Sequence, residues 1–293
     1  MLNRMLKTAV PALAALLLAS CGGGERHGVT ISITDAPIDL ASSVNVSFAQ
    51  IKLSGPNVAP TVLNISPAAS IDLFQLQGGL TQLMVPSIQA QPGHYDTLSL
   101  TLLADQTSGQ TSITLPDGVH ILYIPPGTPT RVNIPVDFDY ASGGDLFLTV
   151  DFDLRKSVVL ATGNYMLRPA LRIVDTLQVG TLEGSVDNTV SIGSLAISDP
   201  TCGPAVYIYS GSGVTPVDIN ATSAVQPLAT AALTLDATSG KYDYSEGFLQ
   251  AGDYTVALVC AAKDDPTTAD TLGFSAAKDA TVTANTTTTV DFP

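Results

Sequence analysis

Tryptophan is absent from this 293-residue sequence, and cysteine and charged side chains are scarce. Only 13% of the residues are Asp, Glu, Lys or Arg, and Cys occurs three times. The absence of Trp removes the largest aromatic surface on which a sugar ring could stack. Glycine and proline are plentiful, and together with Thr, Ser and Val they suit strands and turns better than helices. The composition therefore predicts an all-β protein.

Basic residues are also few, since 12 Lys and Arg stand against 26 Asp and Glu and give a formal charge of −14. A chain with a net negative charge repels phosphate groups. The charge argues against nucleic acid as a partner. The charge also argues against binding of anionic lipid headgroups by basic side chains.

The sequence motifs of common catalytic chemistries are missing. The chain has no HExxH zinc motif, no Gly-x-Ser-x-Gly nucleophile elbow and no glycine-rich phosphate loop before a lysine. Its three histidines, His27, His94 and His120, are scattered, and such residues are more often on the surface than ligands or bases. We predict that the protein is not an enzyme and that it needs no cofactor.

Aspartates are the remaining candidates for a chemical site. A weak metal hypothesis involves Asp137, Asp139, Asp151 and Asp153, because calcium prefers carboxylate oxygens. The spacing departs from a calcium loop, since Leu148 stands where a bidentate Glu belongs. Asp151 and Asp153, about 7 Å apart on one strand face, could also form a glycosidase pair. We favour a third interpretation, in which these aspartates form structural ion pairs and solvated edges.

The first 20 residues are organised like a secretory signal peptide. Arg4 and Lys7 precede an apolar run, and no acidic residue occurs among them. The run is too short to cross a bilayer as a helix. Leu18-Ala19-Ser20-Cys21 resembles the bacterial lipobox, in which the Cys thiol receives diacylglycerol and signal peptidase II cleaves before it. The resemblance implies a signal peptide over residues 1–20, acylation of Cys21 and a flexible tether over residues 21–28.

The predicted location is the bacterial cell envelope, with the protein held by its lipid. Position 22 is Gly rather than Asp, which by similarity to enterobacterial sorting rules favours the outer membrane. Once Cys21 is acylated, only Cys202 and Cys260 remain. An even pair in an oxidising compartment is more often bridged than free. We therefore predict a disulfide between Cys202 and Cys260.

Residues 145–175 have the clearest strand pattern. Every second side chain of residues 146–154 is apolar, and the polar ones between them include Thr149, Asp151 and Asp153. A second alternating run follows in residues 165–173. The simplest interpretation is an antiparallel hairpin with its apolar face on a core and its polar face in water. In that hairpin Asp153 would lie opposite Arg168 and Thr149 opposite Arg172.

Turn residues separate predicted strands about every ten residues, which is typical of sandwiches, and the length suggests two domains. We predict two antiparallel β-sandwich domains in tandem, over residues 29–176 and 177–293, after the lipoprotein signal peptide. In the first, several motifs occur together: Ser32-Ile33-Thr34-Asp35-Ala36-Pro37-Ile38-Asp39, Ile71-Asp72-Leu73, Pro92-Gly93-His94-Tyr95, Asp151-Phe152-Asp153 and residues 165–172. This combination resembles the bacterial family called domain of unknown function 4382. The resemblance implies a fold and a place in anchored lipoproteins, but no reaction.

The second predicted domain resembles the prealbumin-like or carboxypeptidase-regulatory-like sandwich. The resemblance lies in residues 248–256, where Gly252 precedes Tyr254 at a strand start. Gly93 and Tyr95 form a similar motif in the first domain. At each corner we expect Gly to take a positive φ, the Tyr ring to pack inward and its hydroxyl to bind nearby backbone.

Two functions of different classes remain open. The leading hypothesis is a non-enzymatic, lipid-anchored cell-envelope protein with a binding or scaffolding role, whose partners are the membrane and envelope proteins or glycans. The alternative is a carbohydrate-binding accessory lipoprotein, as the prealbumin-like resemblance implies. Exposed aromatic rings would discriminate between them. A groove formed by Tyr207, Tyr209, Tyr242 and Tyr244 would favour the glycan binder, whereas core positions would count against it.

Overall fold

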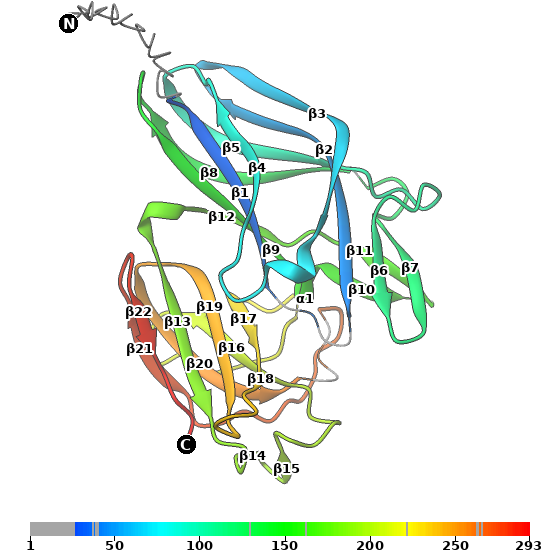
Figure 1. The fold of residues 1–293 in the computed structure, drawn as a ribbon, viewed down its shortest axis with the longest axis vertical. Coiled ribbons are helices and arrows are strands. Elements are labelled where there is room, and N and C mark those ends of the chain that lie inside the picture. The colour runs from blue at the N-terminus through cyan, green and yellow to red at the C-terminus, as the bar shows by residue number, and fades with distance from the viewer. Residues whose placement is uncertain are drawn as a thin grey trace, which may run out of the picture.

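The computed structural model describes residues 27–36, 38, 41–128, 130–161, 163–220, 222–261, 264 and 266–293. The predicted signal peptide, Cys21 and most of the tether lie outside these residues. The described part of the chain is almost entirely β-structure, as the composition predicts, and forms two sandwiches joined end to end (Figure 1).

The first sandwich is built from two sheets that enclose one apolar core. The smaller sheet has the strand order β12-β9-β1-β4, and the larger has the order β10-β11-β7-β6-β2-β5-β8, with β3 paired to β2. Alternate apolar side chains of both sheets, such as Ile33, Phe48, Leu98 and Phe152, are fully buried between them. Its elements are β1 (Val29–Ala36), β2 (Ser43–Gly55), β3 (Val58–Asp72), η1 (Leu73–Leu76), β4 (Gln82–Ile88), β5 (Gly93–Leu102), β6 (Ser112–Leu115), β7 (Gly118–Tyr123), β8 (Arg131–Tyr140), β9 (Leu146–Asp153), α1 (Leu154–Ser157), β10 (Val158–Ala161), β11 (Asn164–Leu167), β12 (Leu171–Asp175) and η2 (Thr176–Gln178).

The second sandwich has its own core between sheets of strand order β18-β19-β13-β22 and β17-β16-β20-β21. Leu182, Val206, Tyr244 and Val256 are among the buried residues. A smaller apolar cluster around Tyr207 covers the outer face of β16 and β20. The elements are β13 (Val179–Val186), β14 (Ser191–Ile192), β15 (Leu195–Ala196), β16 (Pro204–Ser210), β17 (Ala229–Ala232), β18 (Thr234–Leu235), β19 (Tyr242–Gln250), β20 (Gly252–Cys260), β21 (Lys278–Val282) and β22 (Thr287–Thr289).

The predicted all-β sandwich fold is confirmed, and most strand pairs are antiparallel, but three pairs of the described strands are parallel. β1 runs parallel to β9, β11 runs parallel to β7, and β13 runs parallel to β22. Each parallel pair joins strands far apart along the chain, as a parallel pairing requires because it needs a long crossover connection. A sequence pattern of period two reports which face is buried and carries no information about strand direction.

The predicted hairpin of residues 145–175 is right in its antiparallel pairing but wrong in its connection and register. β12 does pair antiparallel with β9, but Arg172 lies opposite Asp151 rather than Thr149. Between these strands the chain turns through α1 and forms the β10–β11 hairpin, which belongs to the larger sheet. Asp153 starts this detour, because its side chain accepts a 3.0 Å hydrogen bond from the backbone N–H of Lys156 and caps α1.

The polar face of β9 is buried rather than solvated. Thr149, Asp151 and Asp153 are at most 7% exposed, because the second sandwich packs against this end of the first. Contacts of β12 with β19 and of β1 with β17 form part of this junction. Charged side chains predicted to face water therefore lie between the two sandwiches.

Both sandwiches contain the predicted tyrosine corner. Tyr95 and Tyr254 are buried, and each hydroxyl donates to the carbonyl oxygen four residues earlier, Gln91 at 2.8 Å and Gln250 at 2.6 Å. Gly93 has a positive φ, as expected, with a value of 145°, whereas the φ of Gly252 is not positive. The tyrosine geometry is thus confirmed at both corners, and the glycine geometry at only one.

Candidate functional site

A cluster of buried charged side chains lies where the two sandwiches meet. Asp35 on β1, Asp151 on β9 and Glu246 on β19 are only 3–5% exposed. Arg172 on β12 lies among the acids, with Nη2 2.5 Å from Asp151 Oδ2 and 3.8 Å from Glu246 Oε1. Its Nη1 donates a 2.8 Å hydrogen bond to the carbonyl oxygen of Phe248. One guanidinium therefore binds both sandwiches, using the several donors that Arg offers in one plane.

Lys156 makes a second link across the same junction. Its Nζ lies 2.8 Å from Asp153 Oδ2 and donates a 2.9 Å hydrogen bond to the carbonyl oxygen of Leu228, just before β17. α1 places Lys156 there, because the single helical turn brings position 156 back over its capping residue. The sequence pattern missed this placement, since one helical turn is too short to give a periodic signal.

Carboxylates outnumber the cations that face them, and the pKa values of the acids reflect this. Burial raises the pKa of Asp35 well above its ordinary range, and the charges of Asp151 and Asp153 raise it further. Burial and then Asp151 raise the pKa of Glu246 in the same direction. Burial also raises the pKa of Asp151, although Arg172 opposes the shift. The junction therefore favours the protonated forms of Asp35 and Glu246.

A cavity of about 530 Å³ opens beside this cluster. Its polar lining includes Asp151, Asp153, Lys156 and Arg172 from the first sandwich. Residues 209–210, Val214 and the loop of residues 223–228 form the wall from the second sandwich. The volume lies within the usual range of small-ligand pockets. The arrangement is suited to binding, since it presents both hydrogen-bond donors and acceptors at a buried edge.

The four aspartates of the metal hypothesis are not brought together. Asp151 and Asp153 are buried and paired with Arg172 and Lys156. Asp137 and Asp139 lie on β8 in the other sheet, where exposed carboxylates approach His94 Nδ1 at 4.0 and 3.2 Å. The ion-pair interpretation therefore describes Asp151 and Asp153, although these pairs are buried and not at a solvated edge.

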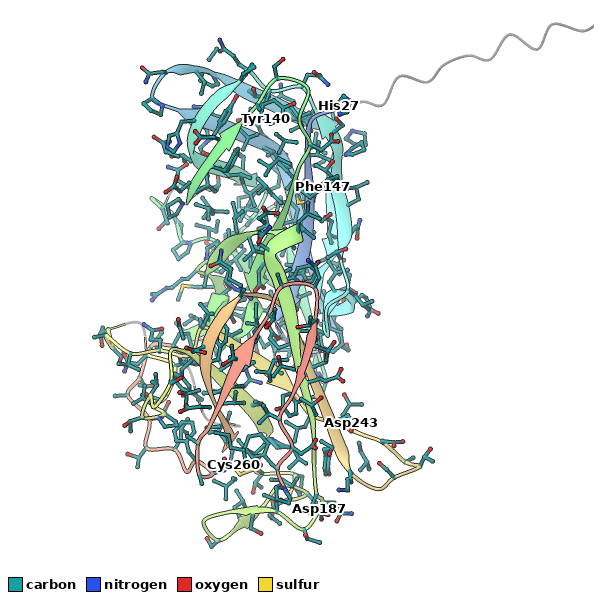
Figure 2. All side chains as sticks on the ribbon, turned by 90° about the vertical axis from the view of Figure 1, so that its left-hand side faces the viewer. His27, Tyr140, Phe147, Asp187, Asp243 and Cys260 are labelled. Atoms are coloured by element: carbon teal, nitrogen blue, oxygen red, sulfur yellow. A yellow bond between two sulfur atoms is a disulfide. The ribbon has the colours of Figure 1, made fainter. Side chains whose placement is uncertain are left out.

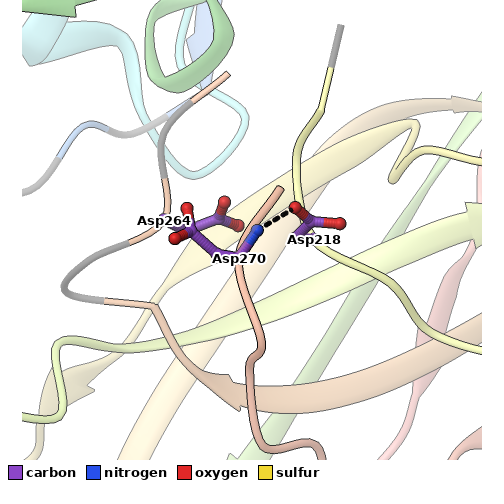
Figure 3. Close-up of side chains that lie close together, drawn as sticks. All are labelled: Asp218, Asp264 and Asp270. Carbon is purple, nitrogen blue, oxygen red and sulfur yellow. Dashed lines mark hydrogen bonds between the residues drawn. The ribbon is translucent and has the colours of Figure 1, made fainter. Parts of the chain in front are cut away.

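A different group of carboxylates comes together in the second sandwich, and no sequence signal pointed to it. Ligand atoms of Asp218, Asp264 and Asp270 all lie within 4.8 Å of one another (Figure 3). Asp264 Oδ2 accepts hydrogen bonds from the Tyr207 hydroxyl at 2.5 Å and from the backbone N–H of Ile219 at 3.1 Å. Asp218 Oδ2 accepts one from the backbone N–H of Asp270 at 2.7 Å. These bonds fix the loops after β16 and β20, and burial raises the pKa of Asp264.

The tyrosines that could have formed a sugar platform are mostly core residues. Tyr207, Tyr209 and Tyr244 are at most 3% exposed. The Tyr209 and Tyr244 hydroxyls donate to the carbonyl oxygens of Val217 and Val290. Tyr242 is half-buried on β19. Their placement counts against recognition of glycans by aromatic stacking.

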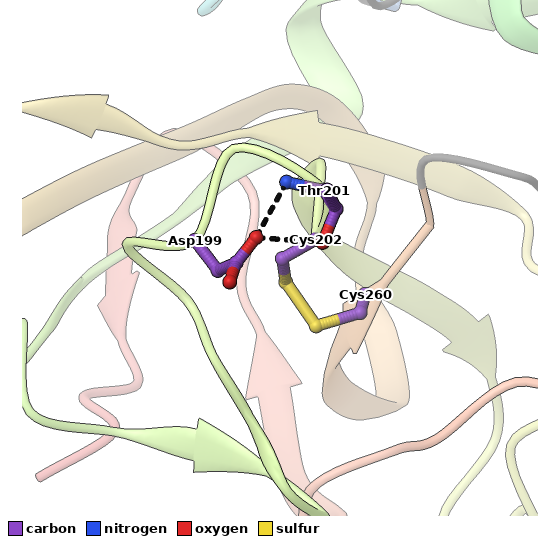
Figure 4. Close-up of a disulfide and its surroundings, with 4 residues drawn as sticks. All are labelled: Asp199, Thr201, Cys202 and Cys260. Atoms are coloured by element: carbon purple, nitrogen blue, oxygen red, sulfur yellow. Dashed lines mark hydrogen bonds between the residues drawn. A yellow bond between two sulfur atoms is a disulfide. The ribbon is translucent and has the colours of Figure 1, made fainter.

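The predicted disulfide is present between Cys202 and Cys260 (Figure 4). It lies where β16 begins and β20 ends, since Pro204 pairs with Cys260 in the sheet. Asp199 shapes the approach to it by accepting hydrogen bonds from the backbone and hydroxyl of Thr201. Among the described residues, no helix is long and apolar enough to cross a membrane.

Comparison with known proteins identifies a family for part of the chain. Residues 28–169 match the model of a domain of unknown function (DUF4382), which confirms the resemblance predicted for this region. The match covers just under half of the chain, and Arg172 lies shortly after it. No curated protein matches the sequence.

Solved structures give only remote similarities. A leucine-rich repeat protein from Bacteroides thetaiotaomicron is 12% identical, with 92% of this chain and 26% of that one covered and a TM-score of 0.25. A minor pilin from Streptococcus agalactiae is 14% identical over 90% of this chain and 94% of that one, with a TM-score of 0.20. A fimbrial anchor protein from Porphyromonas gingivalis is 9% identical over 78% and 77%, also with a TM-score of 0.20. This chain spans about a quarter of the first of these proteins, and TM-scores this low support no argument about function.

Proposed function

We propose that this chain is a lipid-anchored protein of the bacterial cell envelope, with a non-enzymatic binding or scaffolding role. The observation that carries the proposal is Leu18-Ala19-Ser20-Cys21 at the end of a signal-peptide-like run. The Cys202–Cys260 disulfide supports it, because such bridges persist in oxidising compartments. Two or three acyl chains on Cys21 would hold the protein firmly, since each buried methylene contributes about 0.8 kcal/mol.

The arrangement of the two sandwiches suits such an anchor. His27, near the end of the proposed tether, lies at the end of the molecule remote from Asp187 in the second sandwich (Figure 2). An anchored chain would therefore hold the first sandwich near the membrane and extend the second away from it. The junction cavity would lie between them, accessible from the aqueous side. We further propose the outer membrane as the location, on the basis of Gly22.

We also propose that the two sandwiches are separate domains, residues 29–176 and 177–293. Their separate apolar cores support this division. We propose a prealbumin-like class for the second domain, on the basis of its tyrosine corner at Tyr254 and of residues 248–256.

The anchor is tested by Cys21→Ser in a bacterial host. We expect this variant to accumulate as unprocessed precursor and to incorporate no labelled palmitate, while Ser20→Ala keeps a small residue before the cleavage site and serves as the matched control. Separation of inner and outer membranes on a density gradient then tests the location. Normal processing of Cys21→Ser to a firmly membrane-bound protein would contradict the proposed anchor.

The second candidate function is that of a glycan-binding accessory protein. The buried tyrosines count against a stacking platform, so any sugar must be recognised mainly through hydrogen bonds. The cavity at the junction, with paired acids and bases along one wall, is the observation that keeps this candidate open.

A further inference from the structure

Two cavities in the described part of the chain differ in the charge of their linings. The larger, about 610 Å³, lies beside β13 and β19, and its charged lining consists of Glu183, Asp243 and Asp291 with no basic side chain. Glu183 and Asp243 are exposed to solvent, so their charges are not held in a buried site. The junction cavity of about 530 Å³ is lined by two acidic and two basic side chains. Its charges are therefore close to balanced.

Asp151, in the lining of the junction cavity, has a buried acceptor without a hydrogen-bond partner. Asp151 is 3% exposed, and its Oδ2 is paired with Arg172. Its Oδ1 is buried without a hydrogen-bond partner, although Asp151 lines the cavity. A buried carboxylate oxygen left unsatisfied costs free energy. A ligand hydroxyl that donates to Oδ1 would remove that cost.

A donor lines the same cavity. The Lys156 ammonium carries three N–H donors, of which one binds the carbonyl oxygen of Leu228, while the charge is paired with Asp153. The cavity thus combines an acceptor at Asp151 with an ammonium group at Lys156. Neighbouring hydroxyl groups of one molecule, each able to donate and to accept, match such a pair.

The charge balance and the apolar wall narrow the class of ligand. An anion would meet Asp151 and Asp153, and a cation would meet Lys156 and Arg172, so a charged ligand would encounter a like charge in either case. The rest of the lining is largely apolar, with Ala170, Leu171, Val214, Val225, Pro227 and Leu228. These side chains can cover the C–H surface of a ring while the charged edge binds its hydroxyl groups. We propose that the junction cavity binds a neutral sugar residue of a glycan, with one hydroxyl group donating a hydrogen bond to Asp151 and a neighbouring hydroxyl group accepting one from Lys156.

This inference rests on the proposed binding function and deepens it, but it does not depend on the lipid anchor. The test uses the full-length, detergent-extracted protein and trisaccharides of equal length. Maltotriose, cellotriose and N-acetylchitotriose are the neutral probes, the galacturonic acid trimer is the anionic probe and the glucosamine trimer is the cationic probe. Binding is measured by saturation-transfer nuclear magnetic resonance and by calorimetric titration.

Val225→Trp is the main variant, because Val225 lines the cavity on a surface loop, is 43% exposed and takes no part in the buried ion pairs. Val119→Trp makes the same change on β7 of the first sandwich, where the side chain is 71% exposed, and is the matched control. Asp151→Asn keeps the side-chain shape and removes the charge. If this last variant folds poorly, Val225→Trp still tests the site.

We expect at least one neutral trisaccharide to bind the wild-type protein. Its affinity should fall at least tenfold in Val225→Trp and in folded Asp151→Asn, and should be unchanged in Val119→Trp. The charged trimers should bind at least tenfold more weakly. Absence of binding to all three neutral probes, tighter binding of a charged trimer, or binding that survives Val225→Trp would overturn the sugar site. Palmitate incorporation at Cys21 is measured separately. The experiments can therefore refute the sugar site without refuting the lipid anchor, and can refute the anchor without refuting the sugar site.

Discussion

Arg172 in the first sandwich donates a 2.8 Å hydrogen bond from Nη1 to the carbonyl oxygen of Phe248 in the second. Phe248 is one of two described residues other than Gly with a positive φ, at 56°. Its peptide is therefore held in a conformation that few side chains adopt. The same guanidinium is paired with Asp151, so the position of one sandwich is coupled to a buried charge in the other.

Removal of the guanidinium should destabilise the protein strongly. Arg172→Met keeps much of the side-chain volume but leaves Asp151 and Glu246 without their cation. Breaking a buried pair in this way costs about 3–5 kcal/mol, because one charge stays buried and uncompensated. Arg168→Met changes an exposed position near by and should cost under about 1 kcal/mol. The free energy of unfolding in urea measures both, and equal values for the two variants would contradict the role assigned to Arg172.

Stability should fall as the pH rises above about 5, because of Asp35 and Glu246. The pKa of each carboxyl is raised in the folded protein, mainly by burial. Between the ordinary carboxyl pKa of about 4 and the raised values, the folded chain holds protons that the unfolded chain has lost. The free energy of unfolding then decreases with pH, by at most about 1.4 kcal/mol per pH unit for each group.

Denaturant titrations at intervals from pH 5 to pH 9 measure this slope. Asp35→Asn and Glu246→Gln should each flatten it, since an amide does not titrate. Asp187→Asn is the control, because hydrogen bonds from Thr189 lower the pKa of Asp187, so that its effect on stability lies below about pH 4. A stability that rises over this range, or a slope that both amide variants leave intact, would rule out the protonated junction.

Loss of the disulfide should weaken the second sandwich. The bridge closes a loop of 58 residues, which stabilises the folded state by about 4 kcal/mol on the chain-entropy account. The double variant Cys202→Ala, Cys260→Ala should therefore unfold at clearly lower urea concentration. A non-reducing peptide map of the wild-type protein should contain the two cysteines in one linked fragment. Two free thiols in that map would show that the bridge does not form.

The sequence pattern was informative wherever a side chain simply faces the core or water. The alternation of apolar and polar residues placed Phe152 and Val150 in the core. The Gly-x-Tyr motif placed Tyr95 and Tyr254 at corners, where their hydroxyls bind the backbone. The cysteine count predicted the disulfide. Each of these inferences depends on local sequence or on composition, which a single chain displays directly.

The candidate site could not be predicted in the same way, because it exists only where the two sandwiches meet. Asp151 occupies the polar face of its strand, and nothing in its neighbourhood along the chain indicates that β19 covers that face. Glu246 offered a signal that was missed. It follows Tyr244 by two positions on an alternating strand, so the two side chains share a face, and an acid on the face of a buried Tyr predicts a buried charge with a partner elsewhere.

The glycines of the two tyrosine corners differ in conformation, although the sequences around them are alike. We therefore expect them to respond differently to substitution. Gly93 has a φ of 145°, and an added Cβ would lie 2.5 Å from Val58 Cγ1. Gly252 has no positive φ, and an added Cβ would have no atom within 4 Å. Gly93→Ala should therefore cost about 1–3 kcal/mol through backbone strain and crowding. Gly252→Ala should change the free energy of unfolding by under about 1 kcal/mol, and could stabilise the protein, because Ala restricts the unfolded chain. Urea denaturation of the two variants side by side decides the matter: similar losses at both positions would mean that the corners impose the same backbone geometry.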